Sequence, residues 1–329
     1  MKLSSILPLL LVAVGCTTTT EMHPSGDPLG YFASREDHLQ RLEPRGNRIL
    51  HGAGANPEDF AEYWEELART PPLLYATHLD LMWLREDWAF ALIDVLARYP
   101  AYVIPQIALS MTHEGSSYAN RVASGELDVQ LDIFCAGLRA LGRPAFVRVG
   151  YGFNSPLTGY RPDSYRRAWT RVAETIHLRH QLDDVATVWC YAADRAPSDF
   201  MPFYPGDQYV DWWGIDLFDP LSFQSESTLD FMAAASERGY PVMIGEAAPR
   251  GPGIEPDSGM WERWFRPFFR FVRGQPGVKA FCYISWYVGN TRIAADLDVL
   301  QRYRDELDDD NYLHATSLEE LRWELEWED

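Results

Sequence analysis

Two positions in the sequence have the residue types and spacing for chemistry on a polar substrate. The segment PVMIGEAAPRG, residues 241–251, ends an apolar run with a single carboxylate, Glu246. A carboxylate at the end of a buried strand is costly to desolvate unless it is paired or used, so Glu246 is a candidate nucleophile. The alternative interpretation is a structural ion pair with Arg148 or Arg250. The second position is Gly152, where a buried strand, FVRVGYGFNSP, leads into a polar loop.

Cleavage of a glycosidic bond usually requires two carboxyl groups. One attacks the anomeric carbon, and the other protonates the departing oxygen. If the segment around Gly152 is a continuous strand, Arg148, Gly152 and Asn154 lie on one face, and Gly152 occupies the place of the second carboxylate. Glu114 and Asp194, which follow two other apolar runs, are candidates for a relocated acid, with solvated loop charges as the alternative.

From residue 48 onward, eight apolar segments alternate with amphipathic ones. The elements that these segments form must position the candidate site residues. The apolar segments read RILHGAG, PLLYATHLD, AYVIPQIALSM, PAFVRVGYGFN, DVATVWCYAA, YVDWWGIDLF, YPVMIGEAAP and VKAFCYISWY. Such near-continuous apolar runs are typical of parallel strands buried on both faces. Helical patterns such as PEDFAEYWEELAR lie between most of them, although DRAPSDFMPFYPGDQ reads mostly as loop.

This alternation predicts an α/β fold with one (β/α)₈ TIM barrel as a single domain. A doubly wound open sheet is the competing architecture, but no glycine-rich phosphate-binding turn follows the first strand. The tail TSLEELRWELEW predicts a terminal helix with a capping box from Ser317 to Glu320. We expect its Leu and Trp side chains to dock against the barrel.

The active site of such a barrel lies at the carboxyl ends of its strands. The polar residues expected there are His51, Asp80, Glu114, Asn154, Asp194, Asp216 and Glu246, with Trp286 after the last strand. We interpret His51, Arg148, Asn154, Asp216 and Trp286 as substrate-binding. Because no CxxC or HxH pair occurs, we predict neither a metal nor a cofactor.

The N-terminus predicts export and lipidation. Lys2 precedes the apolar run ILPLLLVAV, which is too short to span a bilayer, since a helix needs about 20 residues. The sequence VAVGC predicts removal of residues 1–15 and acylation of Cys16, with ordinary cleavage near Gly15 as the alternative. Residues 16–30 then form a flexible tether, and residues 31–329 form the barrel. We expect a lipoprotein of the cell envelope, in the outer membrane or at the cell surface.

Composition narrows the class of ligand that the protein is expected to bind. The net charge of −19, without a basic cluster, argues against nucleic acid, whose phosphates need Lys and Arg. The chain contains 12 Trp, 17 Tyr and 16 Phe residues, and flat aromatic rings stack on sugar faces. With Cys16 acylated, three cysteines remain in apolar segments, which predicts buried free thiols. We expect a monomer that binds a neutral oligosaccharide or polysaccharide.

The chain resembles the bacterial branch of glycoside hydrolase family 26, the β-mannanase-like enzymes. The resemblance covers most of residues 47–314 and rests on ILHGAGANPEDFAEYW, VIPQIALSM, GRPAFVRVGYGFN, YPGDQYVDWWGIDLF, YPVMIGEAAPRG and VKAFCYISW. It implies a barrel with the acid on strand four and the nucleophile on strand seven. Glu246 falls on the nucleophile, and Trp286 falls on an aromatic platform. Arg148 and Asn154 frame strand four, and Gly152 falls on the acid/base glutamate, where relatives read GYEFN.

Together these observations predict an exported, lipid-anchored, glycoside hydrolase-like protein that acts on β-linked, mannan-like polysaccharide with an impaired or relocated acid. A non-catalytic carbohydrate-binding lipoprotein is the direct alternative. A cell-envelope scaffold that uses the barrel as a protein-binding surface is a third class.

Overall fold

Eight parallel strands close into a barrel in the part of the chain that the structure describes. The computed structural model describes residues 40–54, 56–193, 199–251, 253–285, 289–314 and 317–327. The strands follow the order β1, β2, β3, β6, β7, β8, β9 and β10, and β10 pairs again with β1. Their bounds are β1 Ile49–Gly54, β2 Leu74–Asp80, β3 Ile104–Ser110, β6 Ala145–Val149, β7 Val185–Ala192, β8 Trp212–Leu217, β9 Val242–Ala247 and β10 Val278–Ile284. The predicted TIM barrel is confirmed, and the open sheet is excluded by the closing pair.

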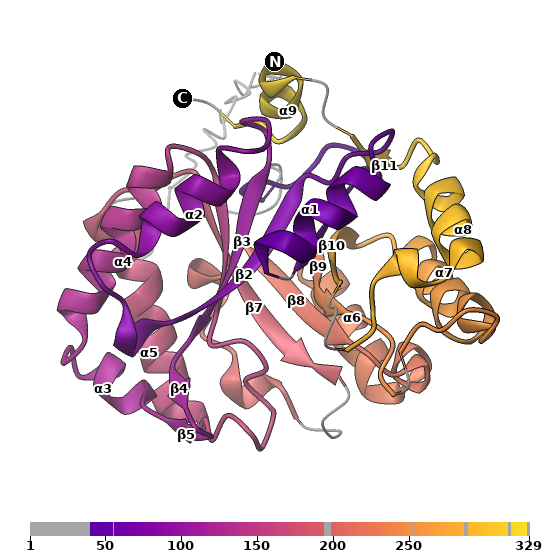
Figure 1. The fold of residues 1–329 in the computed structure, drawn as a ribbon. Helices are drawn as coiled ribbons and strands as arrows, with labels where there is room; N and C mark the ends of the chain where they lie inside the picture. The colour runs from indigo at the N-terminus through magenta and orange to yellow at the C-terminus, as the bar shows by residue number, and fades with distance from the viewer. Residues whose placement is uncertain are drawn as a thin grey trace, which may run out of the picture. The chain divides into compact units, whose positions relative to one another are not determined.

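Helices connect the strands and surround the barrel (Figure 1). They are α1 Pro57–Glu66, α2 Trp88–Leu96, α3 Ala119–Ala123, α4 Asp128–Leu141, α5 Pro162–Glu174, α6 Glu226–Glu237, α7 Arg266–Gly274, α8 Leu297–Leu307 and α9 Leu318–Glu324. A short hairpin, β4 Thr112–His113 and β5 Ser116–Ser117, follows β3. Between β7 and β8 the described residues form loop with two short 3₁₀ turns, as predicted. No described helix combines the length and apolar character needed to cross a bilayer.

Strand alternation separates two apolar cores. Outward-facing residues such as Trp189 and Trp213 pack against the surrounding helices in a large outer core. Inward-facing residues such as Leu50, Phe146 and Trp212 form a smaller inner core inside the barrel. Most strand residues of this inner core come from the first halves of their strands, so apolar packing fills the amino-terminal end of the barrel and leaves the other end for polar residues.

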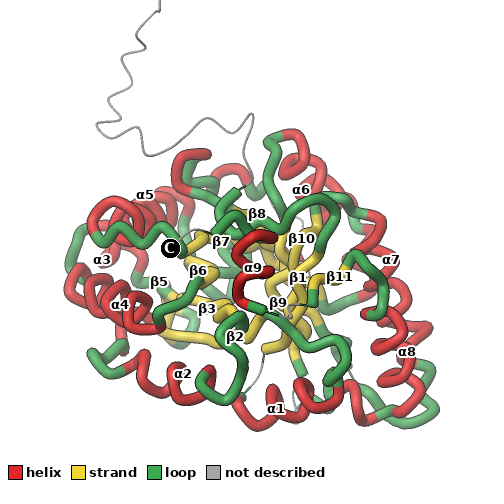
Figure 2. Tube along the Cα trace, turned by 90° about the horizontal axis from the view of Figure 1, so that it is seen from above, coloured by secondary structure: helices red, strands yellow, loops and turns green. Residues whose placement is uncertain are grey.

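Helix α9 covers the amino-terminal end of the barrel, where Figure 2 shows it across the ring of strands. Leu321 and Leu325 are buried in the inner core. The Ser317 hydroxyl accepts a hydrogen bond from the Glu320 amide at 3.1 Å, as the capping box predicts. Trp327 packs against the inner core, as expected, whereas Trp323 is 61% exposed, so the expectation is wrong for that residue. The short strand β11, Tyr312–Leu313, pairs with the start of β1 at the same end.

Candidate active site

A bulge in β9 turns Glu246 into the barrel mouth. Ile244 pairs with Phe281 and Ala247 pairs with Tyr283, so three residue steps on β9 oppose two steps on β10. Ile244 and Ala247 both face the outer core. Without the extra residue, strict alternation would point Glu246 outward together with Ile244. Bulges of this kind commonly re-aim a side chain next to an active site.

Arg148 on β6 joins the two carboxylates of the site. Its guanidinium is fully buried, and Nη1 donates to Glu246 Oε1 at 2.8 Å. Its Nη2 lies 2.7 and 2.8 Å from the two Asp216 oxygens. Gly245 leaves room for this arrangement, because a Cβ there would lie 2.6 Å from Arg148 Nε and 3.0 Å from Asp216 Oδ1. The predicted ion pair between Glu246 and Arg148 is therefore present.

Two aromatic residues complete the surroundings of Glu246. His78 on β2 places Nε2 2.9 Å from Glu246 Oε1. The Tyr151 ring lies over the Arg148 guanidinium, with 5.0 Å from Cζ to the ring centroid, and meets the His78 ring edge-on at 5.5 Å. The Glu246 side chain keeps 16% of its surface exposed, so it remains reachable from the mouth. His78 and Tyr151 were not predicted as site residues; His78 had the signal of a polar residue near a strand end.

These contacts set the ionisation of the two carboxyl groups. Burial would raise the pKa of Glu246, but Arg148 and His78 outweigh burial and lower that pKa to about 2. Burial raises the pKa of Asp216 to about 7 against the opposing charge of Arg148, and the nearby Glu246 carboxylate adds to the rise. Glu246 is therefore ionised at neutral pH, as a nucleophile must be.

The end of β6 differs from the predicted continuous strand. The strand ends at Val149, and both Gly150 and Gly152 adopt left-handed backbone conformations with φ of 54° and 60°. Alternation therefore stops before Gly152, and the prediction that Arg148, Gly152 and Asn154 share one strand face is wrong. A Cβ on Gly152 would meet Ala192 Cβ at 3.7 Å as its nearest described atom, so this position is open.

Asn154 connects loop to strand rather than pointing toward Arg148. Its Oδ1 accepts from the Ala192 amide at 2.8 Å, and its Nδ2 donates to the Ala192 carbonyl at 2.9 Å. These two bonds use the amide group of the side chain. Asn154 therefore fixes the loop after β6 against the end of β7, a positioning role in place of the predicted substrate contact.

The predicted substrate contacts of His51 and Asp216 are not supported by their surroundings. His51 is fully buried and faces the outer core, where its ring packs near Phe281 and its Nε2 lies 3.2 Å from His314 Nδ1. The assignment of His51 to the mouth is wrong because the inward residues of β1 are Leu50, Gly52 and Gly54. Asp216 does point inward, but its side chain is 6% exposed and is held by Arg148.

The candidates for a relocated acid are not brought to Glu246 by any described contact. Glu114 is exposed at the tip of the β4–β5 hairpin, with a φ of 47°. Asp194, Trp286 and Cys16 lie outside the described residues. Cys135, Cys190 and Cys282 are buried free thiols, as predicted. The described ranges hold no group of three or more His, Cys, Asp or Glu side chains suited to a metal ion.

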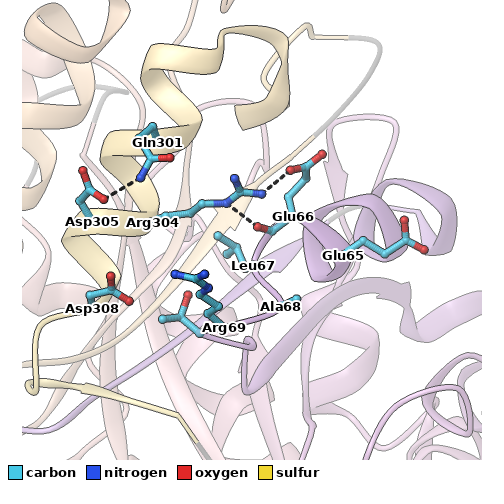
Figure 3. A pocket seen from close by; sticks show the side chains of 10 residues that line it. Glu65, Glu66, Leu67, Ala68, Arg69, Gln301, Arg304, Asp305 and Asp308 are labelled. Atoms are coloured by element: carbon cyan, nitrogen blue, oxygen red, sulfur yellow. Dashed lines mark hydrogen bonds and ion pairs between the residues drawn. The ribbon is translucent and has the colours of Figure 1, made fainter.

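A cavity of about 380 Å³ lies between α1 and α8 (Figure 3), and Glu246 is not among its lining residues. It is lined by Glu65, Glu66, Leu67, Ala68, Arg69, Thr70, Gln301, Arg304, Asp305 and Asp308. Arg304 crosses it and donates to the Glu66 carbonyl and carboxylate, both at 2.7 Å. Thr70 and Asp308 lead into the starts of β2 and β11, so the cavity lies at the amino-terminal end of the barrel.

Comparison with known proteins concerns the family and the fold. Residues 140–257, about a third of the chain, match the model of Glycosyl hydrolase family 26 and include β6 to β9. Over 313 aligned residues the chain is 23% identical to the Beta-1,3-xylanase TXYA of Vibrio sp, covering 82% of this chain and 67% of that protein. Over 252 residues it is 23% identical to a Beta-1,3-xylanase of Alcaligenes sp, covering 66% of this chain and 54% of that protein. The chain thus spans between about half and two thirds of these relatives.

A solved structure shows the same fold. The catalytic domain of the Bacillus sp. JAMB-750 GH26 Endo-beta-1,4-mannanase aligns with a TM-score of 0.64 and 13% identity, over 84% of this chain and 90% of that one. At this identity the similarity concerns the fold. The match to the family model supports membership of family 26, in agreement with the resemblance seen in the sequence motifs.

Proposed function

We propose that the protein is an exported glycoside hydrolase of the family 26 type that acts on β-linked polysaccharide. One observation carries the proposal: the β9 bulge presents an ionised Glu246 at the barrel mouth, held by Arg148 and His78. The relatives named above are β-1,3-xylanases and an endo-β-1,4-mannanase. Both activities concern β-linked chains, so β-1,4-mannan and β-1,3-xylan are the substrates to test.

The proposed reaction begins with attack by Glu246 on the anomeric carbon. A bond forms between the carboxylate oxygen and that carbon as the bond to the leaving oxygen breaks, and water later hydrolyses the glycosyl ester. Arg148 and His78 hold the attacking carboxylate in place, and Asp216 holds Arg148. The leaving oxygen needs a proton unless it is a good leaving group, and Gly152 supplies none.

A non-catalytic carbohydrate-binding protein is the second candidate, and Gly152 is the observation that favours it. The open, left-handed position at the end of β6 carries no carboxylate. Loss of a general acid lowers the reaction rate by roughly 10²–10⁴-fold. A protein that kept the mouth of the barrel but lost this group would retain sugar binding with little turnover of natural chains.

Turnover of aryl β-mannosides and β-xylosides with good leaving groups separates the two candidates. If Glu246 is a working nucleophile, the protein should cleave these substrates much faster than mannan or xylan. Azide or formate should accelerate the reaction by entering the space beside Gly152 and attacking the glycosyl ester. Binding of oligosaccharides without turnover of any aryl glycoside would favour the binding protein.

Anchoring to the cell envelope through Cys16 is part of the proposal. It is supported by the apolar run ILPLLLVAV, whose last three residues begin the sequence VAVGC. Acylation of Cys16 would hold the barrel at a membrane surface, where it would act on polysaccharide outside the cell.

A further inference from the structure

An exposed indole beside the barrel mouth is held in place by neighbouring polar residues. Trp83 ends the 3₁₀ turn Leu81–Trp83 that follows β2, and it is 63% exposed. Its Nε1 donates to His113 Nδ1 at 3.4 Å, and the two rings meet edge-on with centroids 5.6 Å apart. His113 belongs to the hairpin after β3, so both residues lie at the carboxyl ends of neighbouring strands. An exposed tryptophan that is oriented in this way presents its face to solvent.

Asp80 fixes the 3₁₀ turn that carries the indole. Asp80 Oδ2 lies 3.5 Å from the same His113 Nδ1, but the two do not form a hydrogen bond while Nδ1 accepts from the indole. Asp80 Oδ1 accepts from the Tyr118 hydroxyl at 2.5 Å and from the Met82 amide at 3.0 Å. Tyr118 is buried, so the cluster is fixed to the core of the protein. The result is an exposed indole with the His113 imidazole at its edge and the Asp80 carboxylate beside that imidazole.

The position of this cluster relative to Glu246 follows from β2. His78, which contacts Glu246, and Asp80 lie two residues apart on the same face of β2. A strand rises about 3.3 Å per residue, so Asp80 lies ~7 Å further out of the barrel than His78. The indole therefore stands one step outward from the nucleophile along the same wall of the mouth.

We infer that Trp83, with His113 and Asp80, forms an outer sugar-binding platform for a β-linked oligosaccharide that extends from Glu246. A pyranose ring presents an apolar face to the indole and hydroxyl groups to the carboxylate and imidazole. Anionic ligands are disfavoured by Asp80 and by the net charge of −19. This inference rests on the proposed function, because it assigns the outer part of the same substrate.

The test is calorimetric binding of hydrolysis-resistant, thio-linked hexasaccharides of β-1,4-mannose and β-1,3-xylose. Trp83→Ala should weaken binding about tenfold or more, because it removes a stacking surface that contributes on the order of a kilocalorie or more per ring. Trp83→Phe should keep most of the affinity. Trp323→Ala is the matched control, since Trp323 is 61% exposed and lies on α9 at the opposite end of the barrel.

The outcomes separate this inference from the proposed function. Unchanged affinity of Trp83→Ala for a hexasaccharide that the unaltered protein binds would overturn the platform and leave the proposed function standing. An equal loss in Trp323→Ala would also overturn it, because the effect would not belong to the mouth. Failure of the unaltered protein to bind either hexasaccharide would overturn both proposals.

Discussion

Arg148 lies between two carboxylates, and this shared contact determines how each of them ionises. One buried positive charge faces two acidic groups, so full ionisation of both would leave an excess negative charge in a poorly solvated place. His78 gives Glu246 a second partner, whereas Asp216 is the more buried of the two. Glu246 therefore keeps the charge, and Asp216 has the raised pKa. The ion pair and the proposed nucleophilic role of Glu246 are not competing interpretations, because the pairing keeps the carboxylate ionised.

This assignment predicts a pH dependence of stability. A pKa of Asp216 raised to about 7 means that the folded protein binds a proton more tightly than the unfolded chain, where the pKa is about 3.9. The stabilisation of the folded state by this proton is fully present below pH 4 and is lost as the pH rises through 7. Asp216→Asn, which mimics the neutral form, should lack this loss. Thermal unfolding of both proteins from pH 4 to 8 measures it. Parallel curves would show that Asp216 does not titrate in this range.

Placing a carboxylate at position 152 should supply the proton donor that the proposed reaction lacks. Gly152→Glu should raise turnover of polysaccharide toward the 10²–10⁴-fold that a general acid supplies. The left-handed backbone at φ 60° adds a cost of about 1–2 kcal/mol for a side chain, so Tm should fall. Gly142→Glu is the matched control, with the same φ and no described atom within 4 Å of a Cβ.

The Gly142→Glu control separates the cost of backbone strain from a gain in proton donation. Gly142→Glu should lose comparable stability without any gain in turnover. A gain in both variants, or in neither, would mean that the space beside Gly152 is not the place of a proton donor.

Among the strands, β9 determines the candidate site, because its bulge directs Glu246 into the barrel mouth. Gly245→Ala should displace Arg148, because the new Cβ would lie 2.6 Å from Arg148 Nε. We expect a loss of about 1–3 kcal/mol from overpacking and a large loss of turnover. Gly277→Ala, at the start of β10, is the control, since its nearest contact would be the Tyr240 carbonyl at 3.9 Å. Chemical unfolding and aryl glycoside assays on both variants measure the effects. Wild-type behaviour of Gly245→Ala would contradict the packing.

The strands were predictable because each is a compact apolar run, but the directions of their side chains were not. His51 was assigned to the mouth from its place near the end of a strand, although alternation on β1 turns it outward. Glu246 was found from the cost of burying a carboxylate, yet it points inward through a bulge that strict alternation does not show. Gly245 was the available signal, since glycine inside a strand often marks a bulge.

The backbone conformation at the end of β6 was likewise not predicted. GYGFN was interpreted as strand, whereas its two glycines allow the left-handed turn that the structure has at Gly150 and Gly152. His78 was missed as a partner of Glu246 because the two residues are 168 positions apart and meet only across the closed barrel. Contacts of this kind depend on the register of all eight strands.

At the scale of the whole molecule, the first described residues, Arg41 and Leu42 among them, pack at the end of the barrel opposite Glu246. Arg41 donates to Asp211 Oδ1, just before β8, and to the Asp183 carbonyl, both at 2.7 Å. Leu42 is buried in the inner core with residues of α9. Leu42 and α9 thus close this end of the barrel, and the polar end is the one that the proposed substrate would reach.

The proposed anchor gives a prediction at this scale. Cys16→Ser should abolish incorporation of a labelled fatty acid and release the exported protein from the membrane fraction, because acylation requires the Cys16 thiol. Cys135→Ser is a suitable comparison, since that thiol is buried and should not be acylated. Labelling of Cys16→Ser at the unaltered level would contradict the anchor.

The central claim is that Glu246 is the nucleophile, and covalent trapping tests it most directly. A 2-deoxy-2-fluoro β-glycoside with a good leaving group should form a stable glycosyl ester on the protein. Mass spectrometry of the intact chain and its peptides should locate the adduct on Glu246, and Glu246→Gln should not be labelled. An adduct on another carboxylate, or continued cleavage of aryl glycosides by Glu246→Gln, would contradict the account.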